Sequence, residues 1–183
     1  MNNNNKNNIE NLNLQTSNLT HLNPWFITGF ADAEASFSIP FQRVQNNKIG
    51  FQIHATFQIG LHKGDRALLE MIRAYFGGVG SITKQGNDLI RLRVSSTKDL
   101  KVIIDHFNKY PLITQKRADF ELFKMIVDII SRKEHLTTEG LRKVVNLRAS
   151  INNGLSDELK AAFPDTIPVQ RPLVTDHKIQ DPN

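Results

Sequence analysis

The sequence contains no cysteine, and this absence excludes disulfide bonds and thiolate metal sites. Its six histidines do not follow the spacing of a zinc site, so a metal ion would have to be held by oxygen atoms. The chain also lacks an apolar run long enough to cross a bilayer, and no membrane partner is expected.

The N-terminal segment lacks the residues that build a core or direct transport. Residues 1–23 contain ten asparagines and one lysine, and such a polar tract buries too little surface to offset the entropy lost on ordering. We expect residues 1–21 to be disordered. The apolar core of a secretory signal and the arginines of a mitochondrial transit peptide are both absent, so the protein is expected to act where it is made.

The remaining residues provide enough apolar surface for one ordinary domain. Of the 183 residues, 39% are apolar, which is adequate for a packed core. We place the domain at residues 22–164 and treat residues 165–183 as a linker-like C-terminal extension. The formal net charge of +5 favours a polyanionic partner, although many basic proteins bind no nucleic acid.

The hydrophobic pattern predicts an α+β fold in which helices alternate with hairpins. Asn23 and Pro24 suit the start of a helix that runs to Glu34 and is apolar on nearly every side, so this helix is expected to be buried. Two hairpins are predicted, with strands at about 36–42 and 49–59, turning near Asn46–Asn47, and at about 79–84 and 89–95. Further helices are predicted at about 65–76, 96–109, 115–131, 138–151 and 157–162. This order gives a four-stranded antiparallel sheet with helices on one face and the other face open.

The open face is predicted to be positively charged. Between residues 35 and 64 there is no acidic side chain, and the second hairpin carries three basic residues and one aspartate. Such a face, with few aromatic residues, suits duplex DNA better than single strands, although alternating polar residues can also be a merely solvated face. The residues predicted to contact DNA are Ser36, Ser38, Gln42, Arg43, Lys48, Gln52, His54, Thr56, Lys84, Arg91 and Arg93.

Two acids, Asp32 and Glu34, stand where the first helix ends. Carboxylates there face the negative end of the helix dipole, which disfavours them. A divalent cation such as Mg²⁺ would compensate, and a metal ion at a phosphate can activate water. The alternative is that both acids bond to neighbouring backbone groups or to an arginine.

The nine residues from Ile27 to Ala35, ITGFADAEA, resemble the signature of the LAGLIDADG homing endonucleases. The order of helices and hairpins around them matches the αββαββα half of that family. The likeness covers about residues 22–174 and includes FQI at 57–59, LHK at 61–63 and YPLITQK at 110–116. A short motif alone is weak, but a motif in the correct strand context is specific.

The resemblance implies a metal-dependent endonuclease that cuts double-stranded DNA. In it, Glu34 and the backbone carbonyl of Ala33 would bind Mg²⁺ or Mn²⁺, and Asp32 would hold the helix end. Gln58 and Lys116 match the polar residues around the attacking water and the scissile phosphate. By pattern alone, Lys116 is an ordinary solvated lysine at a helix start.

The family pairs two halves through their signature helices, so that each half serves one DNA strand. The residues expected at this interface are Trp25, Gly29, Phe30 and Asp32. Only one signature is present, yet residues 167–174 and those that follow resemble the linker of single-chain members. Three accounts remain: a homodimer, one part of a split or truncated two-half enzyme, or a degenerate relic. Intron RNA maturase activity and non-cleaving DNA binding are the alternative functions, and members encoded in fungal mitochondrial introns imply a mitochondrial location.

Ala35 replaces the glycine that usually ends the signature. If this position required a positive φ, the methyl group would displace Glu34 and weaken catalysis.

Overall fold

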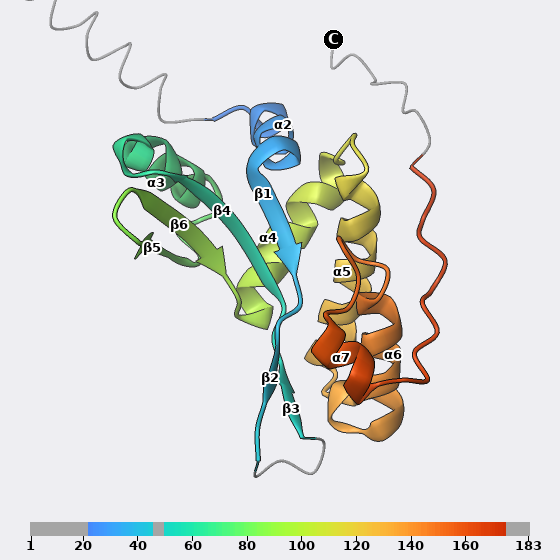
Figure 1. Cartoon of the computed structure of the whole chain (residues 1–183). Coiled ribbons are helices and arrows are strands. Elements are labelled where there is room, and N and C mark those ends of the chain that lie inside the picture. The colour runs from blue at the N-terminus through green and yellow to red at the C-terminus, as the bar shows by residue number, and fades with distance from the viewer. Residues whose placement is uncertain (1–21, 46–49, 175–183) are drawn as a thin grey trace, which may run out of the picture.

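The computed structural model describes residues 22–45 and 50–174, in which a sheet carries helices on one side (Figure 1). The first hairpin unit consists of α2 Pro24–Glu34, β1 Ala35–Ser38, β2 Phe41–Arg43, β3 Phe51–Ile53 and β4 Thr56–His62. A second unit follows, with the 3-10 turn η1 Lys63–Asp65, α3 Arg66–Tyr75, β5 Ser81–Gln85 and β6 Leu89–Val94. The chain continues through α4 Thr97–Lys109, α5 Lys116–Ser131, η2 Glu134–Leu136, α6 Thr138–Arg148 and α7 Asp157–Ala162. The predicted α+β order is confirmed.

The four-stranded sheet has the order β1-β4-β6-β5, and all its neighbouring strands are antiparallel. Strands β2 and β3 form a separate antiparallel ladder that extends the first hairpin beyond the sheet (Figure 1). The predicted turn at Asn46–Asn47, residues 1–21 and residues 175–183 lie outside the described residues, and the domain boundaries stay a prediction. Along the described chain, each helix is too short or too polar to cross a bilayer.

Alternate side chains of the central strands form the core. Phe37 of β1 and Phe57 of β4 are paired in register, and both are fully buried. Phe37 also packs against aromatic rings from α4 and α5, namely Phe107, Phe120 and Phe123. Burying a side chain of this size stabilises the fold by roughly 1.5–3 kcal/mol, so this cluster fixes the helices against one sheet face.

Among the described residues, helix α2 is buried on one face only, and the expected burial of its other face against a second helix stays a prediction. The Asn23 side chain accepts a hydrogen bond from the Trp25 amide, and Ile27, Thr28 and Ala31 face the core. On the opposite face Phe26 is 43% exposed, and a Cβ built on Gly29 would meet no described atom within 4 Å. The described residues therefore leave an apolar face of α2 uncovered.

A buried polar cluster joins α2 to α3 and α4. The Thr28 hydroxyl donates to the Tyr110 carbonyl (2.9 Å) and lies 3.2 Å from His106 Nε2, while the Tyr75 hydroxyl lies 3.0 Å from Nδ1. Because the Thr28 proton is already used, these distances assign the proton of neutral His106 to Nε2. Burial lowers the pKa of His106 to about 4.

Residues 163–174, which we call the C-terminal strap, run beside α5 and α6 (Figure 1). The Ile167 amide donates to the Asn146 side chain (3.1 Å), and the Ser150 hydroxyl donates to the Val169 carbonyl (2.6 Å). These bonds place the next residues of the strap over the start of α5.

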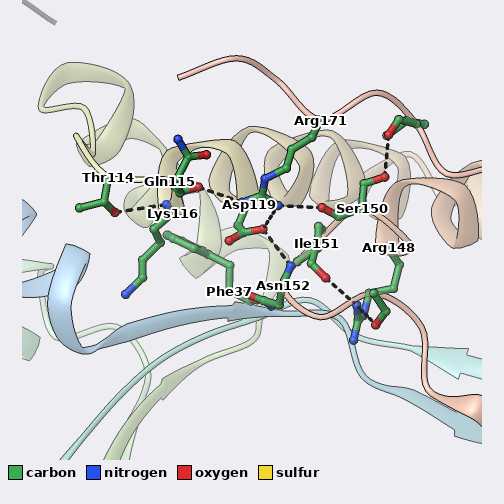
Figure 2. Close-up of polar contacts among 12 residues, drawn as sticks. Phe37, Thr114, Gln115, Lys116, Asp119, Arg148, Ser150, Ile151, Asn152 and Arg171 are labelled. Atoms are coloured by element: carbon green, nitrogen blue, oxygen red, sulfur yellow. Dashed lines mark hydrogen bonds and ion pairs between the residues drawn. The ribbon is translucent and has the colours of Figure 1, made fainter. Parts of the chain in front are cut away.

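Arg171 of the strap is bound at three points (Figure 2). Its guanidinium donates to the Asp119 carboxylate (2.6 Å), the Ser150 carbonyl (2.8 Å) and the Gln115 carbonyl (2.9 Å). Asp119 is 8% exposed and also accepts the Asn152 amide (2.9 Å). The strap is thus tied to the first turn of α5.

We expect Arg171→Met to lower the free energy of unfolding by roughly 1–3 kcal/mol, because it leaves the Asp119 carboxylate buried without a cation. The matched control is Arg43→Met. Arg43 pairs with Glu158, both side chains are 65% exposed, and its loss should change stability by less than about 1 kcal/mol. Urea unfolding of both variants checks this prediction, and equal losses would contradict it.

The low pKa of His106 predicts that stability falls in acid. In the unfolded chain His106 binds a proton below about pH 6.5, whereas in the folded protein it stays neutral until about pH 4. Its contribution is therefore complete above pH 6.5 and is lost as the pH falls towards 4. Between pH 7 and pH 5 the wild type should lose roughly 1–2 kcal/mol more than His106→Gln does. Urea unfolding at both pH values measures the two losses, and equal losses would rule this out.

Candidate active site and nucleic-acid interface

Glu34 lies at the junction of the exposed α2 face and the sheet. It is exposed and, among the described residues, its carboxylate has no hydrogen bond or ion pair. Because α2 ends at Glu34, the carbonyl of Ala33 has no amide partner further along the helix. Both are oxygen donors of the kind that a hard divalent cation takes. Within residues 22–45 and 50–174 no group of three or more His, Cys, Asp or Glu side chains that could hold a metal ion exists, so a cation bound to these two donors would need further ligands from elsewhere.

Asp32, two residues earlier, is used inside the chain. Its carboxylate accepts the Ile113 amide (2.9 Å) and the Thr114 hydroxyl (2.7 Å). The Thr114 oxygen in turn accepts the Lys116 amide (3.2 Å). The alternative expectation, that both acids bond to neighbouring groups of the protein, is therefore correct for Asp32 but not for Glu34.

Lys116 in the first turn of α5 points to the end of α2. Its ammonium donates to the Ala31 carbonyl (3.0 Å), and burial lowers its pKa although Asp32 and Glu34 act in the opposite direction. Figure 2 shows its side chain leaving α5 on the side opposite Arg171. Lys116 is thus not the solvated lysine that the pattern alone indicated.

Gln58 reaches the same region from the sheet. Its amide donates to the Ser36 hydroxyl (3.0 Å), and Ser36 follows Glu34 by two residues. The structure therefore brings Ala33, Glu34, Gln58 and Lys116 to one end of the open face. Position 35 does not require a positive φ. The φ of Ala35 is −82°, and its methyl group fits that extended backbone without displacing Glu34.

The strand register defines the open face in rows. One row crosses all four strands through Ser36, Gln58, Arg93 and Ser81, and the next rows hold Gly60, Arg91 and Thr83, then His62, Leu89 and Gln85. Ser81, Thr83 and Gln85 were missed by the sequence analysis. The missing signal is the turn of residues 86–88, which pairs Gln85 with Leu89 and so decides which side chains of β5 face outward.

Two of the residues predicted to contact DNA lie off the open face, and a third lies on it but is buried. Lys84 pairs with Ile90 and so lies on the helix-covered face, at its exposed end. Arg43 bonds Glu158 of α7 (2.8 Å), because it shares the side of β2 that faces the helices. Thr56 is 2% exposed, and the Arg93 guanidinium lies 3.5 Å from its hydroxyl.

The other predicted DNA contacts keep accessible or half-buried positions. Gln42 and Gln52 pair across β2 and β3 and are exposed, while Ser38 and His54 are half-buried. Lys48 lies outside the described residues.

The predicted interface residues lie along α2 but do not all face outward. Gly29 and Trp25 are exposed and Phe30 is half-buried, although the Trp25 ring also packs edge-on against Tyr110 (5.4 Å). The Asp32 carboxylate is bonded within the chain. Phe26, which stacks on Phe30 (5.7 Å), was missed. Phe26 could have been assigned to the outer face of α2 from the sequence, because positions 26, 29, 30 and 33 have the spacing of one helix face.

Comparison with known proteins agrees with this arrangement. The family model described as LAGLIDADG endonuclease matches residues 27–127, which is more than half of the chain. A probable intron-encoded endonuclease 3 of Neurospora crassa is 44% identical over 163 residues, covering 88% of this chain and 31% of that protein. The chain thus spans about a third of the length of this curated relative.

Solved structures show the same likeness. The meganuclease I-CpaMI bound to uncleaved DNA has a TM-score of 0.85 and 48% identity, over 88% of this chain and 55% of that one. I-SmaMI bound to an uncleaved DNA target in the presence of calcium ions has a TM-score of 0.85 and 45% identity, over 88% and 55%. The matching signature, fold and sequence together show that this chain belongs to the LAGLIDADG endonuclease family.

Proposed function

We propose that the chain is one half of a site-specific homing endonuclease that hydrolyses phosphodiester bonds in double-stranded DNA. The observation that carries the proposal is the unpartnered Glu34 carboxylate, which stands where the polar open face meets the uncovered face of α2. DNA-bound relatives of the same fold support the choice of duplex DNA as substrate.

In this proposal Glu34 and the Ala33 carbonyl hold a divalent cation, Mg²⁺ or Mn²⁺. When bound, such an ion activates a water molecule and stabilises the leaving oxygen. The donors present fit a hard cation, because both are oxygen atoms and no described residue forms a hydrogen bond or ion pair with the carboxylate. The relative solved with DNA and calcium ions supports a cation of this type.

The remaining residues of the site orient groups and move protons. Lys116, whose pKa is lowered by burial, releases a proton more readily than an exposed lysine and can donate it near the scissile phosphate. The Gln58 amide, held by Ser36, can orient the attacking water. Asp32 keeps the start of α5 against the end of α2, so that Lys116 and Glu34 remain close.

A second half completes the site, since one chain supplies one Glu34. We propose that it packs against the α2 face formed by Phe26, Gly29, Phe30 and Ala33, where the absence of a side chain at Gly29 permits close approach of another helix. The partner is either a second copy or a sister half. The mitochondrion is the proposed location, in keeping with the intron-encoded relative.

Replacing Glu34→Gln should lower the cleavage rate by roughly 10²-fold or more, because an amide is a poor ligand for a hard cation. Duplex binding should stay within about threefold, since the open face is unchanged. The assay uses a randomised duplex library with Mg²⁺ and this chain, alone and with a second half added. Glu139→Gln on α6, a change at an exposed carboxylate far from the site, is the matched control.

Unchanged cleavage by the Glu34 variant would refute its role. Preferential binding of intron RNA over any duplex would favour the maturase alternative, and salt-sensitive duplex binding without nicks would identify a non-cleaving relic.

Gly29→Leu should abolish cleavage by blocking the approach of a second α2, while the chain stays folded because the added side chain meets open space. Ala74→Leu, an exposed change on α3, is the control and should cut normally. Light scattering of the wild type over a range of concentrations tells a self-paired dimer from a chain that needs a sister half. Full activity of the Gly29 variant would exclude this face as the interface.

A further inference from the structure

Leu89 is a large apolar side chain on an otherwise polar face. It is 54% exposed and lies on the same side of β6 as Arg91 and Arg93. The other exposed large apolar side chains of the described chain lie on helices, on the segment before α5 or on the C-terminal strap. Single exposed apolar residues are common, so the position of Leu89 must carry the argument.

Leu89 lies at the hairpin end of the sheet, where its backbone is held on both sides. Leu89 begins a strand that has neighbours on both sides, and it is in register with His62 of β4 and Gln85 of β5. The turn before it is fixed to the end of β4, because the Lys63 amide donates to the Asp88 carbonyl (2.7 Å) and the Lys63 ammonium pairs with the Asp88 carboxylate (2.7 Å). A side chain held in this way can serve for recognition.

The chemistry of the major groove offers one good match for such a side chain. Base edges there present hydrogen-bonding groups, and the 5-methyl group of thymine is their apolar feature. Gln85 beside Leu89 is a residue type that bonds adenine, and Arg91 lies two residues along the same face, roughly 7 Å away, where it can bond guanine or phosphate. Leu89 thus lies between polar side chains that suit the hydrogen-bonding groups of the neighbouring base edges.

We infer that Leu89 is a specificity-determining residue that selects thymine at one position of the target by contacting its 5-methyl group. The inference rests on the proposed function, because it requires that the open face binds duplex DNA. It adds an apolar contact to a face whose other assigned contacts are polar.

The test removes the methyl group and nothing else. A duplex selected from a randomised library by the full chain is prepared with each thymine replaced in turn by deoxyuridine, and binding is measured at fixed salt. We expect one position at which deoxyuridine weakens binding about fourfold, the effect of exposing one buried methyl group. Leu89→Ala should bind the thymine and deoxyuridine duplexes equally at that position, and Leu89→Met should keep the preference.

Val102→Ala, which shortens an exposed apolar side chain on α4, is the control and should discriminate like the wild type. Tight duplex binding without a sensitive thymine, or a preference that survives in Leu89→Ala, would overturn the inference and leave the proposed function standing. A wild-type chain that selects no duplex would contradict the proposed function itself, and this inference with it.

Discussion

The hydrogen bonds that Asp32 accepts from the segment before α5 are the contact on which the site depends. They hold the negative end of the α2 dipole, which disfavours a carboxylate, against the positive start of α5, which favours one. The same contact sets Lys116 beside the last turn of α2. Two acids only two residues apart thus acquire different environments: Asp32 is hydrogen-bonded within the protein, whereas Glu34 has no hydrogen bond or ion pair among the described residues.

Helix α2 has two different faces. Its inner face is fixed by Ile27, Thr28 and Ala31, and its outer face is apolar but uncovered. On the other side of α5, Arg171 of the C-terminal strap donates a hydrogen bond to the Gln115 carbonyl, just before Lys116 (Figure 2). The first turn of α5 is therefore supported from two directions, by the end of α2 and by the strap, before any partner is present.

Features that depend on neighbouring residues were predictable from the sequence. The caps at Asn23 and Ser96 and the alternation of Ile90, Leu92 and Val94 placed the elements correctly, because caps and alternation are local. The motif also placed Glu34 correctly at the helix end.

Features that depend on distant partners were not predictable. Lys84 was assigned to the wrong face, because the sequence does not show the turn geometry that sets the register of β5. The ion pair of Arg43 with Glu158 joins residues 115 positions apart, and the cover over Thr56 comes from another strand. Local patterning contains no information about either contact.

Gly60 leaves a bare spot beside Arg91 in the middle of the polar sheet surface. A methyl group placed there would meet only the Ile90 carbonyl, at 4.0 Å, so the gap results from a missing side chain and is not forced by crowding. Arg91, which is paired with Gly60, therefore has no side chain beside it at that position of β4. In the proposed function, an arginine beside such a bare position can turn to meet a changed base pair, so the preferred DNA sequence can drift while the buried core of the sheet stays the same.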